Sequence, residues 1–253
     1  MTVENIVKKL LMKQVPPTYT QPSVAMSVDG DDSLRILYEI GTKLAPKLEA
    51  TFTQNDAGPL TSIQFYKNDE PIIDAVSTTS PATYQSTEFF LYSNNVHYRV
   101  IADYAEGTIK KDNLGNDYPT GHIAAGSKIG RGATILPYRR GYFAGYTTNT
   151  DALNSATIRA LTYKKNSGYE AITFNLTVKA GAKRVIIACP ATDTGMTKVL
   201  NTSALNADVT STFTKSTVEV EGANGYTAIA YNVWTFVPDV AYGQDAVLAV
   251  TLG

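Results

Sequence analysis

The sequence is poor in the residues that most often build chemical sites. Its 253 residues include one cysteine, two histidines and one tryptophan. A single cysteine excludes an intrachain disulfide and favours folding in a reducing compartment. His97 and His122 lie in different segments, and neither has a cysteine or carboxylate neighbour at ligand spacing. This pattern argues against a zinc site.

Surplus charge and long apolar runs are also missing. The formal net charge is −1, so the chain lacks the basic surface by which most proteins attract nucleic acid or anionic lipid. No apolar run approaches the roughly 20 residues that span a bilayer, and the first residues lack the pattern of a signal peptide. We therefore expect no nucleic-acid partner and no membrane span.

Catalytic motifs are not found. The chain has no G-x-S-x-G elbow, and its Gly126-Ser127-Lys128 triplet lacks the spacing of a phosphate-binding loop. Cys189 ends an apolar run before Pro190, which favours a buried small hydrophobe over a nucleophile. We expect a protein that is not an enzyme, with no catalytic, cofactor-binding or metal-binding residues and no cofactor.

Each of two acidic clusters could be a functional site or an ordinary structural feature. Asp29, Asp31 and Asp32 suit calcium, but the rest of the calcium-loop signature is absent, which favours a turn with solvated carboxylates. Glu219 and Glu221 lie two residues apart, as a carboxylate pair for glycoside hydrolysis would. The solvent face of an antiparallel strand explains them better.

Alternation of apolar and polar residues dominates the first half of the chain. Short alternating runs are separated by turn residues, which is typical of a β-sandwich. The predicted strands cover residues 23–28, 47–53, 62–67, 84–91 and 96–103.

Tyr98 points to an immunoglobulin-like sandwich. It stands two residues before Val100, at the spacing of a tyrosine corner, in which the tyrosine hydroxyl bonds to upstream backbone. We predict an immunoglobulin-like β-sandwich over residues 23–138. Within it, residues 110–132 are rich in glycine and polar residues and predict a long loop with a short edge strand.

The second half predicts another β-sandwich, over residues 139–253. Asn224-Gly225 favours a hairpin over residues 217–236, because both residues tolerate positive φ. A short helix is expected over residues 152–161, capped by Thr150 or Asp151. Arg139-Arg140 suits either a contact with a partner or a solvated seam between the two predicted domains. The other predicted strands cover residues 172–178, 184–188, 196–200 and 246–252.

The N-terminal residues predict an amphipathic helix. Its apolar residues recur at helical spacing, and Pro16-Pro17 ends the pattern. So short a helix must dock on something, either its own domain or a neighbouring subunit. We treat residues 1–22 as an arm and linker, with candidate assembly contacts at Val3, Ile6, Val7, Leu10 and Leu11. The fold class is all-β, with two tandem sandwiches behind a short N-terminal helix.

Four stretches of the chain resemble segments of virion structural proteins of tailed bacteriophages. They are residues 48–69, 102–127, 178–190 and 197–236. The relatives are accessory proteins of the tail, baseplate or fibre. The resemblance implies a chain made in the host cytoplasm and built into the virion, with other virion proteins and copies of itself as partners. It supplies no catalytic residues.

Two functions remain open from the sequence. The first is a non-catalytic virion protein that acts by docking subunits in the tail or baseplate, or as a fibre or decoration component. The alternative is a module that binds a host glycan or host surface, which rests on β-sandwich architecture and abundant tyrosine.

Overall fold

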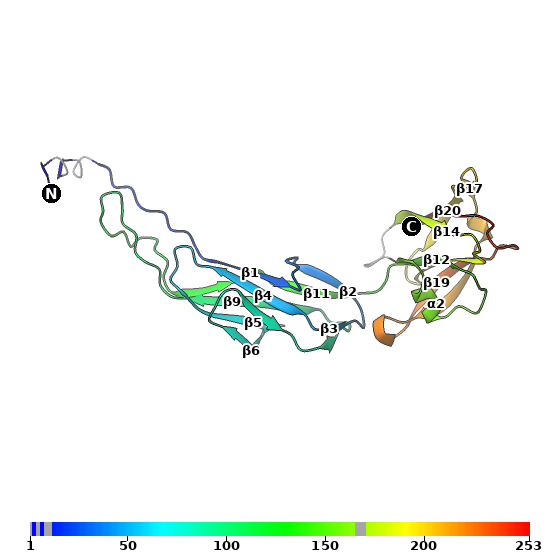
Figure 1. The fold of residues 1–253 in the computed structure, drawn as a ribbon, viewed down its shortest axis with the longest axis horizontal. Coiled ribbons are helices and arrows are strands. Elements are labelled where there is room, and N and C mark those ends of the chain that lie inside the picture. The colour runs from blue at the N-terminus through cyan, green and yellow to red at the C-terminus, as the bar shows by residue number, and fades with distance from the viewer. Residues whose placement is uncertain (1, 4–5, 8–11, 165–170) are drawn as a thin grey trace. The chain divides into compact units, whose positions relative to one another are not determined.

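The chain is mostly β-structure and divides into two compact units. The computed structural model describes residues 2–3, 6–7, 12–164 and 171–253 (Figure 1). Unit 1 comprises Met1–Ile36, Ala45–Glu88 and Asn95–Ile135. Unit 2 comprises Leu37–Leu44, Phe89–Asn94 and Leu136–Gly253. Two short segments from the first hundred residues therefore belong to the unit that holds the C-terminus.

Unit 1 contains two sheets. The smaller has the order β1-β4-β7, and the larger has the order β2-β11-β9-β5-β6 with β10 also paired to β9. The smaller sheet consists of β1 (Ser23–Val28), β4 (Lys47–Thr53) and β7 (Ala82–Gln85). The larger consists of β2 (Arg35–Glu39), β5 (Leu60–Lys67), β6 (Glu70–Ser77), β9 (Val96–Tyr104), β10 (Gly126–Ile129) and β11 (Ala133–Tyr138). The last three residues of β2 and of β11, 37–39 and 136–138, are assigned to unit 2.

The core of unit 1 lies where alternating strands face each other. On β9 every second residue from Val96 to Tyr104 is buried, as the period of two requires. A Cβ added at Gly130 would lie 2.5 Å from Val100 Cγ1 and 3.1 Å from Val24 Cγ1. Side chains of both sheets therefore meet at this point. The strands predicted over residues 23–28, 47–53, 62–67 and 96–103 are confirmed.

Two predictions for unit 1 were wrong in detail. Tyr98 is fully buried, but its hydroxyl lies 3.4 Å from the Ser86 hydroxyl rather than on backbone. The strand predicted over residues 84–91 is broken. β7 ends at Gln85, and Phe89–Phe90 forms β8, which pairs with β3 (Lys43–Leu44). The Ser86 N–H still donates to Pro46 O, one step beyond the Lys47–Gln85 pair of the β4/β7 ladder. Pro46 has no N–H to return the bond, so the pairing ends there.

Unit 2 also has two main sheets, of order β13-β12-β15-β19-β18 and β14-β20-β16-β17. The first consists of β12 (Phe143–Thr147), β13 (Tyr163–Lys164), β15 (Arg184–Pro190), β18 (Thr214–Val220) and β19 (Ile229–Phe236). The second consists of β14 (Ile172–Val178), β16 (Met196–Asn201), β17 (Ala207–Asp208) and β20 (Ala246–Leu252). Short helical elements are α2 (Ser155–Arg159), η1 (Thr210–Thr212) and η2 (Ala223–Gly225).

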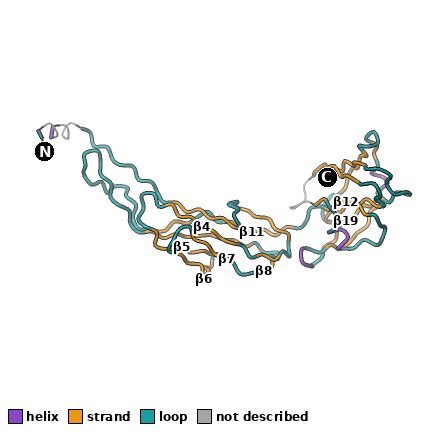
Figure 2. The backbone as a smooth tube through the Cα atoms, in the orientation of Figure 1, coloured by secondary structure: helices purple, strands orange, loops and turns teal. Residues whose placement is uncertain are grey.

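The five-stranded sheet of unit 2 is covered on both faces. One face carries Val185, Ile187 and Cys189, which pack against the second sheet. The other carries Ile186 and Ala188, which pack against α2 through Ile158. This explains why β15 reads as a continuous apolar run, and the prediction of a strand buried on both faces is confirmed. Figure 2 shows the helix as a single short turn beside the strands.

Two local signals in unit 2 turned out differently from the prediction. The helix is capped by Asn154, not Thr150 or Asp151, because Asn154 Oδ1 accepts from the Thr157 N–H at 2.9 Å. The predicted hairpin pairs as expected, from Val220 against Ile229. Its Asn224-Gly225 turn, however, lies at the tip of a longer connection between the two strands.

Candidate functional site

The residues singled out for chemistry are occupied in structural contacts. His97 Nδ1 lies 3.0 Å from Thr134 Oγ1, and His122 Nε2 lies 2.6 Å from Glu106 Oε1. Cys189 is fully buried in the core of unit 2, and burial raises the pKa of its thiol to about 12. Among the residues that the structure describes, no cluster of three or more His, Cys, Asp or Glu side chains suits a metal ion.

The two acidic clusters serve a turn and a solvent face. Asp29 Oδ1 accepts from the Lys47 N–H at 2.8 Å, and Asp31 Oδ1 accepts from the Ser33 N–H at 2.8 Å. Hydrogen bonds from Ser33 lower the pKa of Asp31. Glu219 and Glu221 are exposed, at the end of an edge strand and just after it. Glu219 therefore lies on the solvent side of β18, as predicted, whereas Glu221 lies beyond the end of that strand.

The chain between residues 13 and 20 lies along the loop that follows β9. Asn113 bonds this segment twice, because its Oδ1 accepts from the Val15 N–H at 2.7 Å and its Nδ2 donates to Lys13 O at 3.0 Å. Gln14 Nε2 donates to Asp112 Oδ2 at 2.7 Å. These bonds join positions about a hundred residues apart in the sequence. In Figure 1 the two segments run together from the sheets of unit 1 toward the N-terminus.

Tyr19 and Lys110 close a second set of contacts, which we call the clasp and which also includes Asp56. The Tyr19 hydroxyl donates to Tyr118 O at 2.8 Å and accepts from the Lys110 N–H at 2.7 Å. Lys110 Nζ lies 2.7 Å from Asp56 Oδ2 and 5.3 Å from the centre of the Tyr19 ring. The hydrogen bond from Lys110 lowers the pKa of Asp56. The linker is therefore fixed to unit 1.

Beyond the clasp, the predicted assembly contacts lie at the surface. Val3, Ile6 and Val7 are 77%, 44% and 46% exposed. The Ile6 N–H donates to Thr2 O at 3.2 Å, which is the spacing of one helical turn. Leu10 and Leu11 lie outside the described residues. The apolar side chains of this segment that the structure describes are therefore open to solvent.

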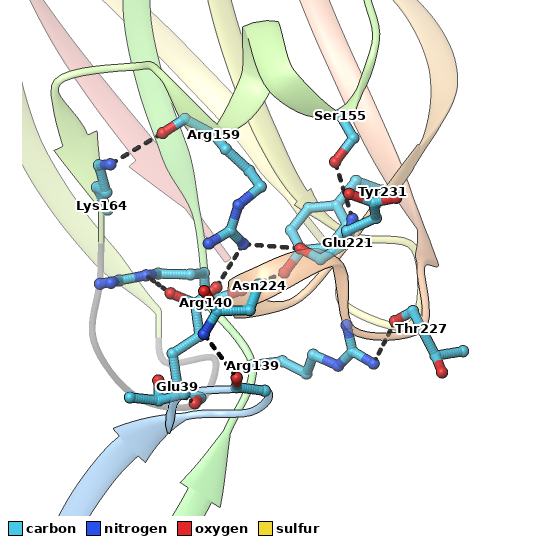
Figure 3. A network of polar contacts seen from close by, with 12 residues as sticks. Glu39, Arg139, Arg140, Ser155, Arg159, Lys164, Glu221, Asn224, Thr227 and Tyr231 are labelled. Atoms are coloured by element: carbon cyan, nitrogen blue, oxygen red, sulfur yellow. Dashed lines mark hydrogen bonds and ion pairs between the residues drawn. The ribbon is translucent and has the colours of Figure 1, made fainter. Parts of the chain in front are cut away.

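Unit 2 holds a polar cluster that the sequence analysis missed, made of Glu39, Arg140 and Arg159 (Figure 3). Glu39 is 8% exposed and accepts from Arg140 Nε at 2.9 Å and from Arg159 Nη1. Arg159 Nη1 also donates to Glu221 O at 2.7 Å. No local pattern could have paired residues this far apart in sequence. The one available signal was Arg140, which was predicted to contact a partner or to lie in a solvated seam between the domains.

Comparison with known proteins adds little. No protein-family model matches the chain, and no curated protein matches it. Among solved structures, the chain is similar to the fibronectin(III)-like modules of Clostridium thermocellum CbhA, with 13% identity over 87% of this chain and 90% of that chain. The TM-score is 0.25, and a similarity at this level carries no inference about this chain. No helix within the described residues is long and apolar enough to cross a membrane.

Proposed function

We propose that the chain is a structural protein of a tailed-bacteriophage virion, built from two immunoglobulin-like sandwiches and acting by docking subunits without catalysis. Its place is the tail or baseplate, or a fibre or decoration component. The proposal rests on the resemblance of residues 48–69, 102–127, 178–190 and 197–236 to such proteins. The observation that carries it is the clasped N-terminal segment, beyond which apolar side chains lie exposed.

The clasp gives the arm a physical advantage in docking. Residues 13–20 are already ordered by their bonds to unit 1, so a neighbour that binds the arm bears less of the cost of ordering the chain. Full burial of an exposed aliphatic side chain contributes about 1.5–3 kcal/mol by apolar transfer. Val3 could gain most of this on docking, and Ile6 and Val7, which are already more than half buried, about half of it each. One such contact is weak by itself, but repeated copies in a symmetric particle bind together with much greater avidity.

A truncation tests the proposal. Removing residues 1–12 deletes the arm but keeps Gln14, Val15 and Tyr19, and with them the bonds to the loop. In the phage that encodes the chain, we expect the truncated protein to fold and to enter particles several-fold less efficiently. Quantitative immunoblotting of purified particles measures this. A matched control replaces exposed apolar residues elsewhere, Ile73→Ser with Leu205→Ser, and should enter normally.

Two results would overturn the proposal. The arm is not the docking element if the truncated chain enters particles as well as the full chain. The virion role itself is wrong if the full chain is absent from purified particles while it accumulates in infected cells.

A further inference from the structure

Three aromatic rings lie in a row on unit 2. The rings of Phe90 and Tyr92 have centroids 6.2 Å apart at an interplanar angle of 16°. Those of Tyr92 and Tyr226 are 5.5 Å apart at 28°. Phe90 and Tyr92 are 44% and 54% exposed, which is unusual for large aromatic side chains that already have ring partners. The row, which we call the aromatic row, is therefore open to solvent.

The aromatic row lines a pocket of about 340 Å³. The rest of the lining is Gly41, Thr227 and the turn formed by residues 223–225. This volume lies within the range of small-ligand sites, which is about 300–1,000 Å³. The lining carries no charged side chain, so the pocket suits a neutral ligand.

The turn beside the aromatic row is held in a fixed shape. Asn224 and Gly225 have φ of 50° and 72°, and the Tyr226 N–H donates to Ala223 O at 3.0 Å, which together describe a type I′ turn. The Ala223 N–H donates to Ile40 O at 2.8 Å, and the side chain of Asn224 (labelled in Figure 3) donates from Nδ2 to Gly41 O at 3.0 Å. A pocket wall fixed in this way costs little entropy when a ligand binds.

Gly41 is required for this contact. Its φ is +87°, and an added Cβ would lie 2.1 Å from Ala223 O. Arg139 supports the other side of the turn, since its Nη2 donates to Thr227 O at 2.7 Å (Figure 3). Its guanidinium also lies 5.3 Å from the centre of the Tyr226 ring. Contacts within the chain therefore hold the pocket in shape without a bound ligand.

Several polar groups at the pocket remain available. Asn224 Oδ1 and the hydroxyls of Tyr92, Tyr226 and Thr227 make no hydrogen bond to any residue that the structure describes. Aromatic rings accept the C–H face of a pyranose, while hydroxyl and amide groups bond its hydroxyls. A purely apolar partner would leave these polar groups unpaired, at a cost of about 1–3 kcal/mol for each one buried.

We propose that this pocket binds a sugar residue of a neutral glycan, with the aromatic row as the stacking surface and Asn224 and Thr227 as hydrogen-bonding groups. The inference does not rest on the virion role. If both hold, the protein would give a particle a direct contact with carbohydrate.

The test uses the purified full chain on an array of neutral oligosaccharides, followed by calorimetry with the sugars that bind. We expect reproducible binding to a set of related glycans. Tyr92→Ala should lower the affinity at least tenfold, which corresponds to about 1.4 kcal/mol. The matched control is Tyr66→Ala, which removes a tyrosine in unit 1 and should leave binding unchanged. Thermal melting of each variant shows that it folds.

Three outcomes overturn the proposal. The first is no binding to any neutral glycan, and the second is binding that neither Tyr92→Ala nor Phe90→Ala weakens. The third is binding to charged glycans alone, with an affinity that falls as salt is added. Capture of a protein partner that Tyr92→Ala abolishes, without glycan binding, would make the pocket a protein-docking site instead. Failure here is distinguishable from failure of the virion role, because Tyr92→Ala should still enter particles normally.

Discussion

Glu39 shows how one side chain can organise a surface of unit 2. A carboxylate with 8% exposure is stable only when its charge is paired, and here two arginines pair it. Arg140 comes from the stretch before β12, and Arg159 is the last residue of α2. Glu39 itself lies in the segment Leu37–Leu44, so the pairing ties that segment to the helix that covers the five-stranded sheet.

Replacing Glu39 should destabilise unit 2 far more than replacing an exposed glutamate. Glu39→Ala removes the carboxylate that pairs with the partly buried Arg140 and Arg159. Breaking a buried pair in this way costs about 3–5 kcal/mol, and we expect a loss in the lower half of that range. Urea unfolding followed by Trp234 fluorescence measures it, because this one tryptophan lies in the core of unit 2.

The matched control for Glu39 is Glu219→Ala on the exposed side of β18, which should shift stability by less than about 0.5 kcal/mol. Equal midpoints for the two variants would show that the paired arginines contribute nothing to stability.

The loop after β9 carries an element that responds to pH. His122 Nε2 lies 2.6 Å from Glu106 Oε1, and its Nδ1 lies 3.1 Å from Pro119 O. Both neighbours are acceptors, so only the doubly protonated ring can donate to both. The hydrogen bond with Glu106 and then that with Pro119 raise the pKa of His122 above its ordinary value of 6.5.

The pKa of His122 is higher in the folded protein than its ordinary value, so protonated His122 stabilises the loop. This stabilisation is complete below the ordinary pKa. It is lost as pH rises through the raised value. Above the raised pKa of His122, we expect the backbone amides of residues 106–122 to exchange faster with solvent. The increase should exceed the one that pH alone causes in the intrinsic rate of amide exchange. NMR titration of the His122 ring, with amide exchange, measures both effects.

The variant Glu106→Gln tests the cause of the His122 shift. It keeps the size of the side chain and removes its charge, so the pKa of His122 should fall back toward 6.5. An unchanged titration curve in this variant would assign the shift to some other group.

The elements differ in how far sequence could predict them. β1, β4, β14 and β20 match the predicted bounds, because each has one buried and one wetter face and so alternates. β6 was missed because it is largely exposed, with Ile73 at 86%, and so carries no clear burial pattern. The type I′ turn at Asn224-Gly225 was predictable, since few other residue pairs accept its φ angles.

The candidate sites are formed by residues that are far apart in the sequence, and no local sequence pattern shows that such residues meet. Tyr19 and Lys110 of the clasp are 91 residues apart, and Glu39 and Arg159 are 120 apart. The aromatic row likewise joins Tyr92 to Tyr226. Sequence spacing describes neighbours along a strand or helix, so it could not predict that residues 13–20 lie along the loop after β9.

For the molecule as a whole, composition and structure bear on how copies would associate. With a net charge of −1, copies repel one another only weakly at long range. The arm instead presents Val3, Ile6 and Val7 to solvent. Association through these residues would be driven by burial of apolar surface, which salt strengthens rather than screens. Association through surface ion pairs would weaken in salt.

This difference makes the mode of docking measurable on purified protein. At about 1 M NaCl the Debye length is only about 3 Å, so contacts between exposed charges are largely screened. We expect sedimentation velocity to show that self-association of the full chain persists or increases at this salt concentration. The chain without residues 1–12 should remain smaller at every salt concentration. Association that disappears in salt, or that survives the truncation unchanged, would contradict docking through the apolar arm and point to charged contacts elsewhere on the surface.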